Sequence, residues 1–104
     1  ELMGINISNQ SFQGPFTDLD QVRDQGGIYA ILGLQQNQRY RVLDVGQAGG
    51  LKSRLSFHDR KDQWSRQGLP LSVAVLYTPN WTEAQRCAFE KQVRTAYNPP
   101  CGDR

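Results

Sequence analysis

The chain has 104 residues, of which 12 are Lys or Arg and 10 are Asp or Glu, and its formal net charge is +2. This length fits one domain, the 2 Cys are too few for a disulfide framework, and the apolar runs fall short of the ~20 residues that a membrane span needs. A secreted disulfide-rich protein, a membrane protein and a coiled coil are excluded, and the lack of a basic-then-apolar leader predicts a reduced, cytoplasmic, globular domain.

The predicted elements begin after residues 1–25, which are polar and rich in turn formers and are expected to be an N-terminal extension of the same domain. Residues 28–32 combine β-branched, aromatic and other apolar side chains behind a Gly-Gly pair, which indicates a buried strand. Residues 39–45 roughly alternate polar and apolar side chains. They are predicted to form the second strand of a hairpin.

A helix is predicted over residues 51–60 after a second Gly-Gly pair, with two leucines four residues apart on one face. Residues 71–77 indicate a third strand, and Thr82 is expected to cap a helix that runs to about residue 97. The predicted order of elements is β-β-α-β-α. The predicted fold class is therefore α+β, with a small three-stranded, mostly antiparallel sheet flanked by helices.

Five features of the sequence occur in an order that is typical of one nuclease family. The tripeptide Gly-Ile-Tyr at 27–29 begins one predicted strand, and Asp-Val-Gly at 44–46 ends the next. Arg54 follows eight residues after the glycine of the second tripeptide, and His58 lies four residues further. Glu90 lies within the last predicted helix. This pattern resembles the GIY-YIG nuclease family.

The resemblance implies a GIY-YIG-like nuclease domain over residues 26–104 that hydrolyses phosphodiester bonds in nucleic acid, with DNA favoured over RNA. Tyr29 takes the position of a general base or water-positioning phenol, and His58 is implied to share the proton transfer or bind phosphate. Arg54 suits stabilisation of the charge that develops on the phosphate, because a guanidinium is planar and stays charged. Glu90 is the implied ligand of Mg²⁺ or Mn²⁺, since magnesium keeps several waters and needs few protein carboxylates.

Substrate contacts are implied for three further positions, Asp44, Gly46 and Lys52. Asp44 is also a departure from the family pattern, because members usually carry a tyrosine there, and a carboxylate cannot supply the proton or the stacking face of a phenol. Tyr40, four residues earlier, is a candidate to compensate in part. A second departure lies near the end, where Pro-Pro at 99–100 is followed by Cys-Gly instead of the asparagine that many members carry.

Each candidate residue also has an ordinary structural explanation. Tyr29 is of a type that commonly fills the core behind a strand, and Arg54 is of a type that covers a helix surface. Glu90 has Arg86 four residues before it and Arg94 four residues after it, so a ladder of i,i+4 ion pairs explains it without a catalytic role. The joint pattern, rather than any single residue, indicates an active site.

The charge distribution leaves other functions open. Residues 39–66 carry seven cations against three Asp, an excess that attracts a polyanion but also occurs on an ordinary solvated helix face. One alternative is a nuclease-like module that binds nucleic acid with weak or no catalysis. The replacement of the family tyrosine by Asp44 is the feature that indicates such a loss of activity. Another is a protein–protein adaptor, which requires Trp64 and Trp81 to form an exposed apolar patch.

Overall fold

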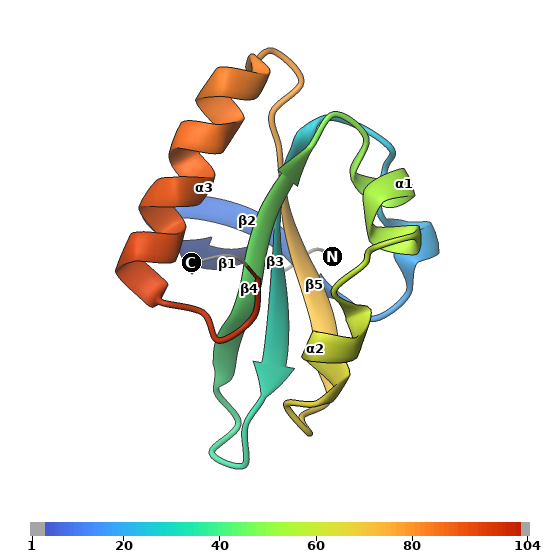
Figure 1. Cartoon of the computed structure of the whole chain (residues 1–104), viewed down its shortest axis with the longest axis vertical. Coiled ribbons are helices and arrows are strands. Elements are labelled where there is room, and N and C mark those ends of the chain that lie inside the picture. Colours follow the sequence, from blue (N-terminus) through green and yellow to red (C-terminus); the bar gives the residue numbers. More distant parts are fainter. Residues whose placement is uncertain (1–3, 103–104) are drawn as a thin grey trace.

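The computed structural model describes residues 4–102, and within them it shows an α+β fold of five strands and three α-helices (Figure 1). The predicted three-stranded sheet in β-β-α-β-α order is wrong, because two additional strands precede the predicted ones. The elements in chain order are β1 (Gly4–Ile7), β2 (Gln10–Phe16), the 3-10 turn η1 (Leu19–Gln21), β3 (Gly27–Leu34), β4 (Tyr40–Ala48), α1 (Leu51–Ser56), α2 (Lys61–Ser65), β5 (Leu71–Tyr77) and α3 (Glu83–Tyr97).

All five strands form one antiparallel sheet with the spatial order β1-β2-β5-β3-β4. The predicted hairpin is the β3–β4 pair. β3 is an inner strand, and its register places Tyr29 opposite Gly46 of β4 and Val75 of β5. The two tripeptides therefore lie in neighbouring strands and meet at one pair, Tyr29 and Gly46.

The helices cover opposite faces of this sheet, with α3 on one face and α1 and α2 on the other (Figure 1). Successive residues of β3 alternate between the two cores, because side chains of a strand point alternately to its two faces. Tyr29 and Ile31 join the core beneath α1 and α2, whereas Ile28 and Ala30 join the core beneath α3. The phenol of Tyr29 thus lies on the side of α1 and α2.

The two unpredicted strands, β1 and β2, lie in the segment that was expected to be a polar extension. β2 buries Phe12, Gly14 and Phe16 at alternate positions, and the residues between them are partly or fully exposed. Phe12 belongs to the core beneath α3 and Phe16 to the core beneath α1 and α2, because the pairing of β2 with β5 shifts in register between Gln13 and Phe16. This shift and the polar residues of the strand obscured its period of two in the sequence.

The helix predicted over residues 51–60 is shorter than expected. α1 ends at Ser56, because Phe57 has a non-helical backbone conformation with φ −125° and ψ 38°. The chain turns there, and α2, which was not predicted, begins at Lys61. The turn between the two short helices directs His58 into the core beneath them, where only 5% of this residue is exposed.

The strand β5 and the helix α3 agree with the prediction. α3 begins with a capping box, in which the Thr82 hydroxyl accepts from the Gln85 backbone N–H and the Gln85 side chain accepts from the Thr82 backbone N–H. These contacts satisfy two amides that would otherwise lack partners at the start of the helix. Over residues 4–102, the helices are too short or too polar to cross a bilayer.

Candidate active site

Tyr29 occupies the centre of the candidate site. Its side chain rises from the inner strand β3 and is buried, with 1% exposure. Gly46 lies opposite it in β4, and a Cβ atom at position 46 would overlap the phenol. The close approach of this side chain therefore requires glycine at position 46. Gly46, predicted to contact substrate, is buried beneath Tyr29.

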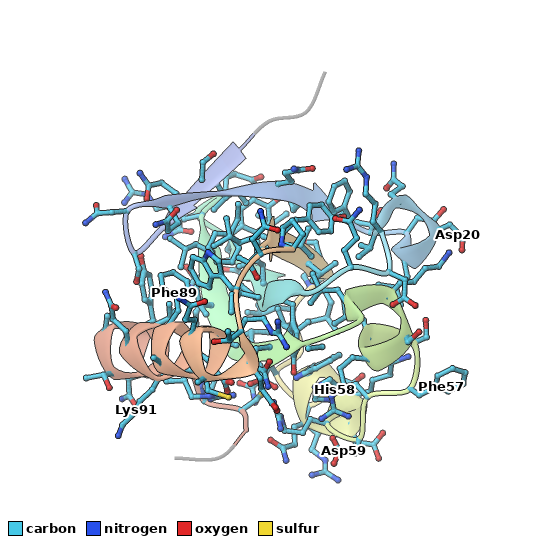
Figure 2. The ribbon with its side chains drawn as sticks, turned by 90° about the horizontal axis from the view of Figure 1, so that it is seen from above. Asp20, Phe57, His58, Asp59, Phe89 and Lys91 are labelled. Carbon is cyan, nitrogen blue, oxygen red and sulfur yellow. The ribbon has the colours of Figure 1, made fainter. Side chains whose placement is uncertain are left out.

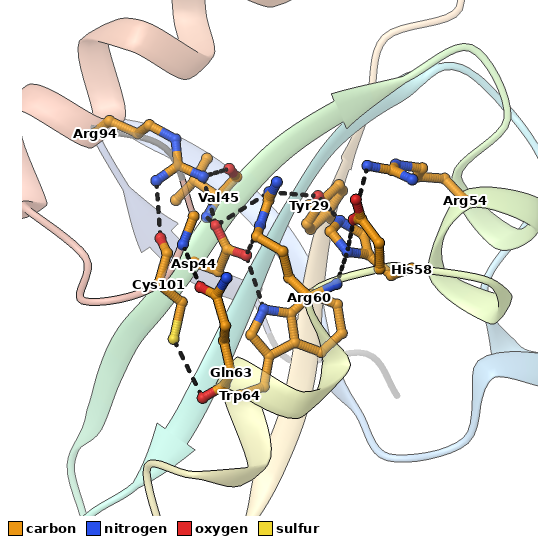
Figure 3. Close-up of polar contacts among 12 residues, drawn as sticks. Tyr29, Asp44, Val45, Arg54, His58, Arg60, Gln63, Trp64, Arg94 and Cys101 are labelled. Atoms are coloured by element: carbon orange, nitrogen blue, oxygen red, sulfur yellow. Dashed lines mark hydrogen bonds and ion pairs between the residues drawn. The ribbon is translucent and has the colours of Figure 1, made fainter.

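His58 contacts Tyr29 from the turn between α1 and α2 (Figure 3). Its Nδ1 accepts a hydrogen bond from the backbone N–H of Arg60 at 3.1 Å. A neutral imidazole that accepts at Nδ1 carries its proton on Nε2, and Nε2 is the atom that hydrogen-bonds the hydroxyl group of Tyr29. His58 is therefore the donor in this bond, and the hydroxyl proton of Tyr29 is left for another acceptor.

Arg60 is a member of the site that sequence reasoning missed. Its Nη2 lies 3.3 Å from the hydroxyl oxygen of Tyr29, and its Nε donates to Oδ2 of Asp44 at 2.8 Å. The side chain is only 17% exposed. The phenol oxygen thus accepts from two donors, Arg60 and His58. No periodic signal marked Arg60, because it lies in the irregular turn before α2.

Asp44 is the hub of a buried network of hydrogen bonds and ion pairs (Figure 3). The residue is fully buried. Its Oδ2 accepts from Nε of Arg60 and from the indole N–H of Trp64 at 2.7 Å. Its Oδ1 accepts from Nη2 of Arg94 and from the backbone N–H of Val45 at 2.8 Å. Both oxygens of Asp44, which is predicted to contact substrate, are thus occupied by donors from the protein itself.

Arg94 connects this network to Glu90 on the same helix. Besides Asp44, its guanidinium contacts Oε2 of Glu90 at 3.2 Å and the backbone carbonyl of Cys101 at 3.1 Å. The predicted ion-pair partner Arg86 donates instead to Gln47 and to a backbone carbonyl. The i,i+4 pair between Glu90 and Arg94 therefore forms, and through Asp44 it joins α3 to the Tyr29 side of the site.

The charges around Tyr29 show which predicted residues share its surroundings. Burial raises the pKa of Tyr29 to about 12; Arg60 and Arg54 oppose this rise, whereas Asp44 and Glu90 add to it. Burial, together with the charges of Arg54 and Arg60, lowers the pKa of His58 to about 4, although nearby carboxylates oppose this shift. At neutral pH the phenol and the imidazole are thus both uncharged. Arg54 pairs with Asp59, whose carboxylate lies 3.4 Å from Nδ1 of His58. Glu90 is linked to the site only through Arg94, which bonds to Asp44.

Arg54 and Lys52 lie on the same short helix, α1, but have different surroundings. Arg54 has a side chain that is 40% exposed and pairs with the exposed carboxylate of Asp59 at 3.5 Å. Lys52, two residues earlier, contacts Asp20 at 3.4 Å, near the 3-10 turn η1. Residues two apart point to different sides of a helix. The structure therefore brings Arg54 to the site and turns Lys52 away from it.

Tyr40, the candidate to compensate for the missing tyrosine, lies outside the site. It is paired with Leu34 at the start of β4, whereas Tyr29 is paired with Gly46 near the other end of that strand. Its side chain is exposed. Tyr40 therefore does not take the place of a second phenol beside Tyr29.

Metal binding rests on Glu90 alone among the predicted residues. Within residues 4–102, no group of three or more His, Cys, Asp or Glu side chains could hold a metal ion. The carboxylate of Glu90 is 25% exposed and gives Oε2 to Arg94. One partly exposed carboxylate fits Mg²⁺, which binds through one or two carboxylates and completes its shell with water and phosphate. Asp44 does not fit, because both of its oxygens already accept hydrogen bonds.

The two tryptophans do not form the apolar patch that an adaptor requires. Trp64 is buried and packs against His58, with ring centroids 4.6 Å apart. Trp81 is half-buried and meets the ring of Phe89 edge to face at 5.8 Å. The two rings thus belong to different sides of the sheet, Trp64 to the α2 side and Trp81 to the α3 side.

Comparison of the chain with protein-family models, with curated proteins and with solved structures gives no significant match.

Proposed function

We propose that this protein is a cytoplasmic GIY-YIG-type endonuclease that hydrolyses phosphodiester bonds in nucleic acid. Its substrate is DNA more than RNA, and its cofactor is Mg²⁺ or Mn²⁺. The observation that carries the proposal is the arrangement around one phenol. Tyr29 from β3 bonds to His58 from the α1–α2 turn. Arg54 from α1 pairs with Asp59 next to His58, and Glu90 from α3 is linked to the site through Arg94.

The arrangement supports a division of roles among these residues. The Tyr29 oxygen accepts from His58 and Arg60, so the hydroxyl proton is free to orient a water molecule that attacks phosphorus. With a pKa of about 12, Tyr29 acts as a positioning phenol and not as a free phenolate at neutral pH. Arg54 is the exposed guanidinium that stabilises the charge developing on the phosphate as the bond to the leaving oxygen breaks. A metal ion on Glu90 would polarise the phosphate.

Plasmid cleavage with Mg²⁺ tests the proposal through two substitutions, Glu90→Ala and Arg54→Ala. We expect each to reduce the rate by roughly 100- to 1,000-fold, the range seen when a group that stabilises the transition state is removed. The melting temperature should change little, because both side chains are partly exposed. Single-stranded, duplex and branched substrates assayed in parallel identify the preferred nucleic acid.

Matched controls are available on the same helix for Glu90 and on the following helix for Arg54. Glu83 is an exposed carboxylate in the first turn of α3, and Arg66 is an exposed guanidinium at the end of α2. Glu83→Ala and Arg66→Ala should leave cleavage within about twofold of the unmodified protein, because surface substitutions away from a site have small effects. Full activity in both Glu90→Ala and Arg54→Ala would rule out the mechanism.

A second candidate function is a nuclease-like module that binds nucleic acid without cutting it. Two observations favour it: Tyr29 is only 1% exposed, and Asp44, in the position of the missing tyrosine, is committed to a buried network. This candidate predicts binding that weakens as salt increases, because phosphate contacts release counterions. It also predicts no cleavage with any divalent ion, so a turnover assay separates the two functions.

A further inference from the structure

Phe57 is a large apolar side chain that the fold leaves in solvent. It is 86% exposed, the highest value among the exposed large hydrophobic residues of the described chain. The two leucines of the preceding helix, Leu51 and Leu55, are buried. Figure 2 shows the ring of Phe57 pointing away from the body of the molecule, beside the turn that carries His58. A phenyl ring that contacts water in this way is available to a ligand.

Two cationic side chains that reach solvent, those of Arg54 and Lys61, lie within four residues of this ring in the chain. Arg54 is exposed on the last turn of α1, and Nζ of Lys61 is held 2.9 Å from the backbone carbonyl of Ser56, the residue before Phe57. The other two cations between residues 52 and 61 pair with carboxylates elsewhere, and the one carboxylate of this segment, that of Asp59, is exposed and pairs with Arg54. An exposed aromatic ring among positive charges is the arrangement that binds single-stranded nucleic acid, in which bases stack on the ring and phosphates meet the cations.

We propose that Phe57 is a stacking platform for an unpaired nucleobase, with the neighbouring phosphates held by Arg54 and Lys61. This inference rests on the proposed function, and it names the substrate class as single-stranded or locally unpaired nucleic acid. Bases within a duplex are already paired and stacked, and extruding one requires free energy. Arg54, the guanidinium assigned to the reacting phosphate, lies three residues before Phe57 at the end of α1, so a base on this ring holds its own backbone beside the helix that carries this group.

A protein partner is the competing occupant of an exposed phenyl ring. The charges favour nucleic acid, because a hydrophobic protein contact does not require cations on both sides of the ring in the chain, as Arg54 and Lys61 are. A partner protein is therefore treated as one outcome of the test.

Binding is measured in the Glu90→Gln variant with EDTA, so that cleavage does not interfere. The probes are a fluorescein-labelled oligothymidylate of about 15 nucleotides and a duplex of the same length, read by anisotropy. Adding Phe57→Ala should weaken single-strand binding by roughly 5- to 150-fold, the effect of losing one stacked base. Phe57→Trp should keep the affinity within about threefold, and its fluorescence should be quenched when the oligonucleotide binds. Phe57→Leu, which is apolar but has no aromatic face, should behave like Phe57→Ala.

Three results would overturn the platform. They are unchanged single-strand affinity in Phe57→Ala, full affinity in Phe57→Leu, and self-association that depends on Phe57 without binding of either probe. The last of these would assign the ring to a protein contact. Cleavage by the protein with intact Glu90 is measured separately. Phe57-dependent binding without cleavage therefore contradicts the nuclease alone, and cleavage with binding that does not depend on Phe57 contradicts the platform alone.

Discussion

The carboxylate of Asp44 joins side chains that come from distant parts of the chain. Arg60 and Trp64 approach it from the segment that contains α2, and Arg94 approaches it from α3 on the other side of the sheet. A buried carboxylate is costly unless cations and hydrogen-bond donors surround it, and Asp44 has both. Its position where the family pattern has a tyrosine is thus explained by the network that it holds together.

Replacing Asp44 should destabilise the protein strongly. In Asp44→Ala the guanidinium groups of Arg60 and Arg94, which are 17% and 15% exposed, lose their common carboxylate. Removing one partner from a buried ion pair costs about 3–5 kcal/mol, and we expect a loss of this size in the free energy of unfolding measured with urea. Asp59→Ala removes an exposed carboxylate and should cost at most about 1 kcal/mol. Similar losses in both variants would contradict the assignment.

The buried imidazole of His58 should make stability depend on pH. Its pKa is about 4 in the folded protein against an ordinary value of 6.5, so the unfolded chain takes up a proton at a higher pH than the native state does. The contribution of His58 is complete above pH 6.5 and is lost as the pH falls toward 4. The slope for one proton is at most about 1.4 kcal/mol per pH unit.

Urea unfolding of the unmodified protein and of His58→Gln at neutral pH and at about pH 5 measures this effect. Glutamine does not titrate, so the variant should lose less stability between the two pH values. The comparison uses the change with pH within each protein, so any constant loss from the substitution cancels. An identical change in both proteins would show that His58 takes up its proton at the same pH when folded and unfolded.

Among the candidate residues, the sequence predicted those with a fixed spacing to a recognisable motif. The prediction named Tyr29, Arg54, His58 and Glu90. Of these, Tyr29 and His58 are in direct contact, whereas Arg54 pairs with Asp59 and Glu90 pairs with Arg94. Arg60 was not predicted, because its role depends on where the turn before α2 directs its side chain. A motif identifies residues by their order, whereas the partners of a buried charge depend on the three-dimensional path of the chain.

At the scale of elements, prediction succeeded where the period of the side chains was clear. β5 and α3 have dense apolar runs or a capping box, and both match their predicted bounds closely. The α1–α2 region was predicted as one helix, because Leu51 and Leu55 alone set the period. The break at Phe57 could not be predicted from helical spacing, since it follows from the tertiary contacts that draw His58 toward Tyr29.

At the scale of the whole molecule, β1 and β2 extend the sheet and complete both cores. Phe12 is fully buried in the core beneath α3, and Phe16 is buried in the core beneath α1 and α2. Residues that appeared to be a polar extension thus contribute to the interior next to the candidate site. The expected three-stranded unit has its β5 edge covered by β2.

Phe12→Ala tests how far the sheet depends on these strands. Removing a fully buried phenyl ring costs about 3–5 kcal/mol, through lost burial and the cavity that remains, and we expect a loss of this size in the free energy of unfolding. Gln10→Ala, in the exposed start of the same strand, should change it by less than about 0.5 kcal/mol. A small effect of Phe12→Ala would show that the core does not rely on β2.

β4 is an edge strand of the sheet, but backbone carbonyls on its free edge around Asp44 already accept hydrogen bonds from other parts of the chain. The Leu43 carbonyl accepts from the backbone N–H of Cys101 at 3.0 Å, and the Val45 carbonyl accepts from the guanidinium of Arg94. Unpaired strand rims invite pairing with other molecules, which leads to aggregation. The segment after α3 and the side chain of Arg94 thus block this part of the β4 edge. They prevent β4 from pairing there with a strand of another molecule.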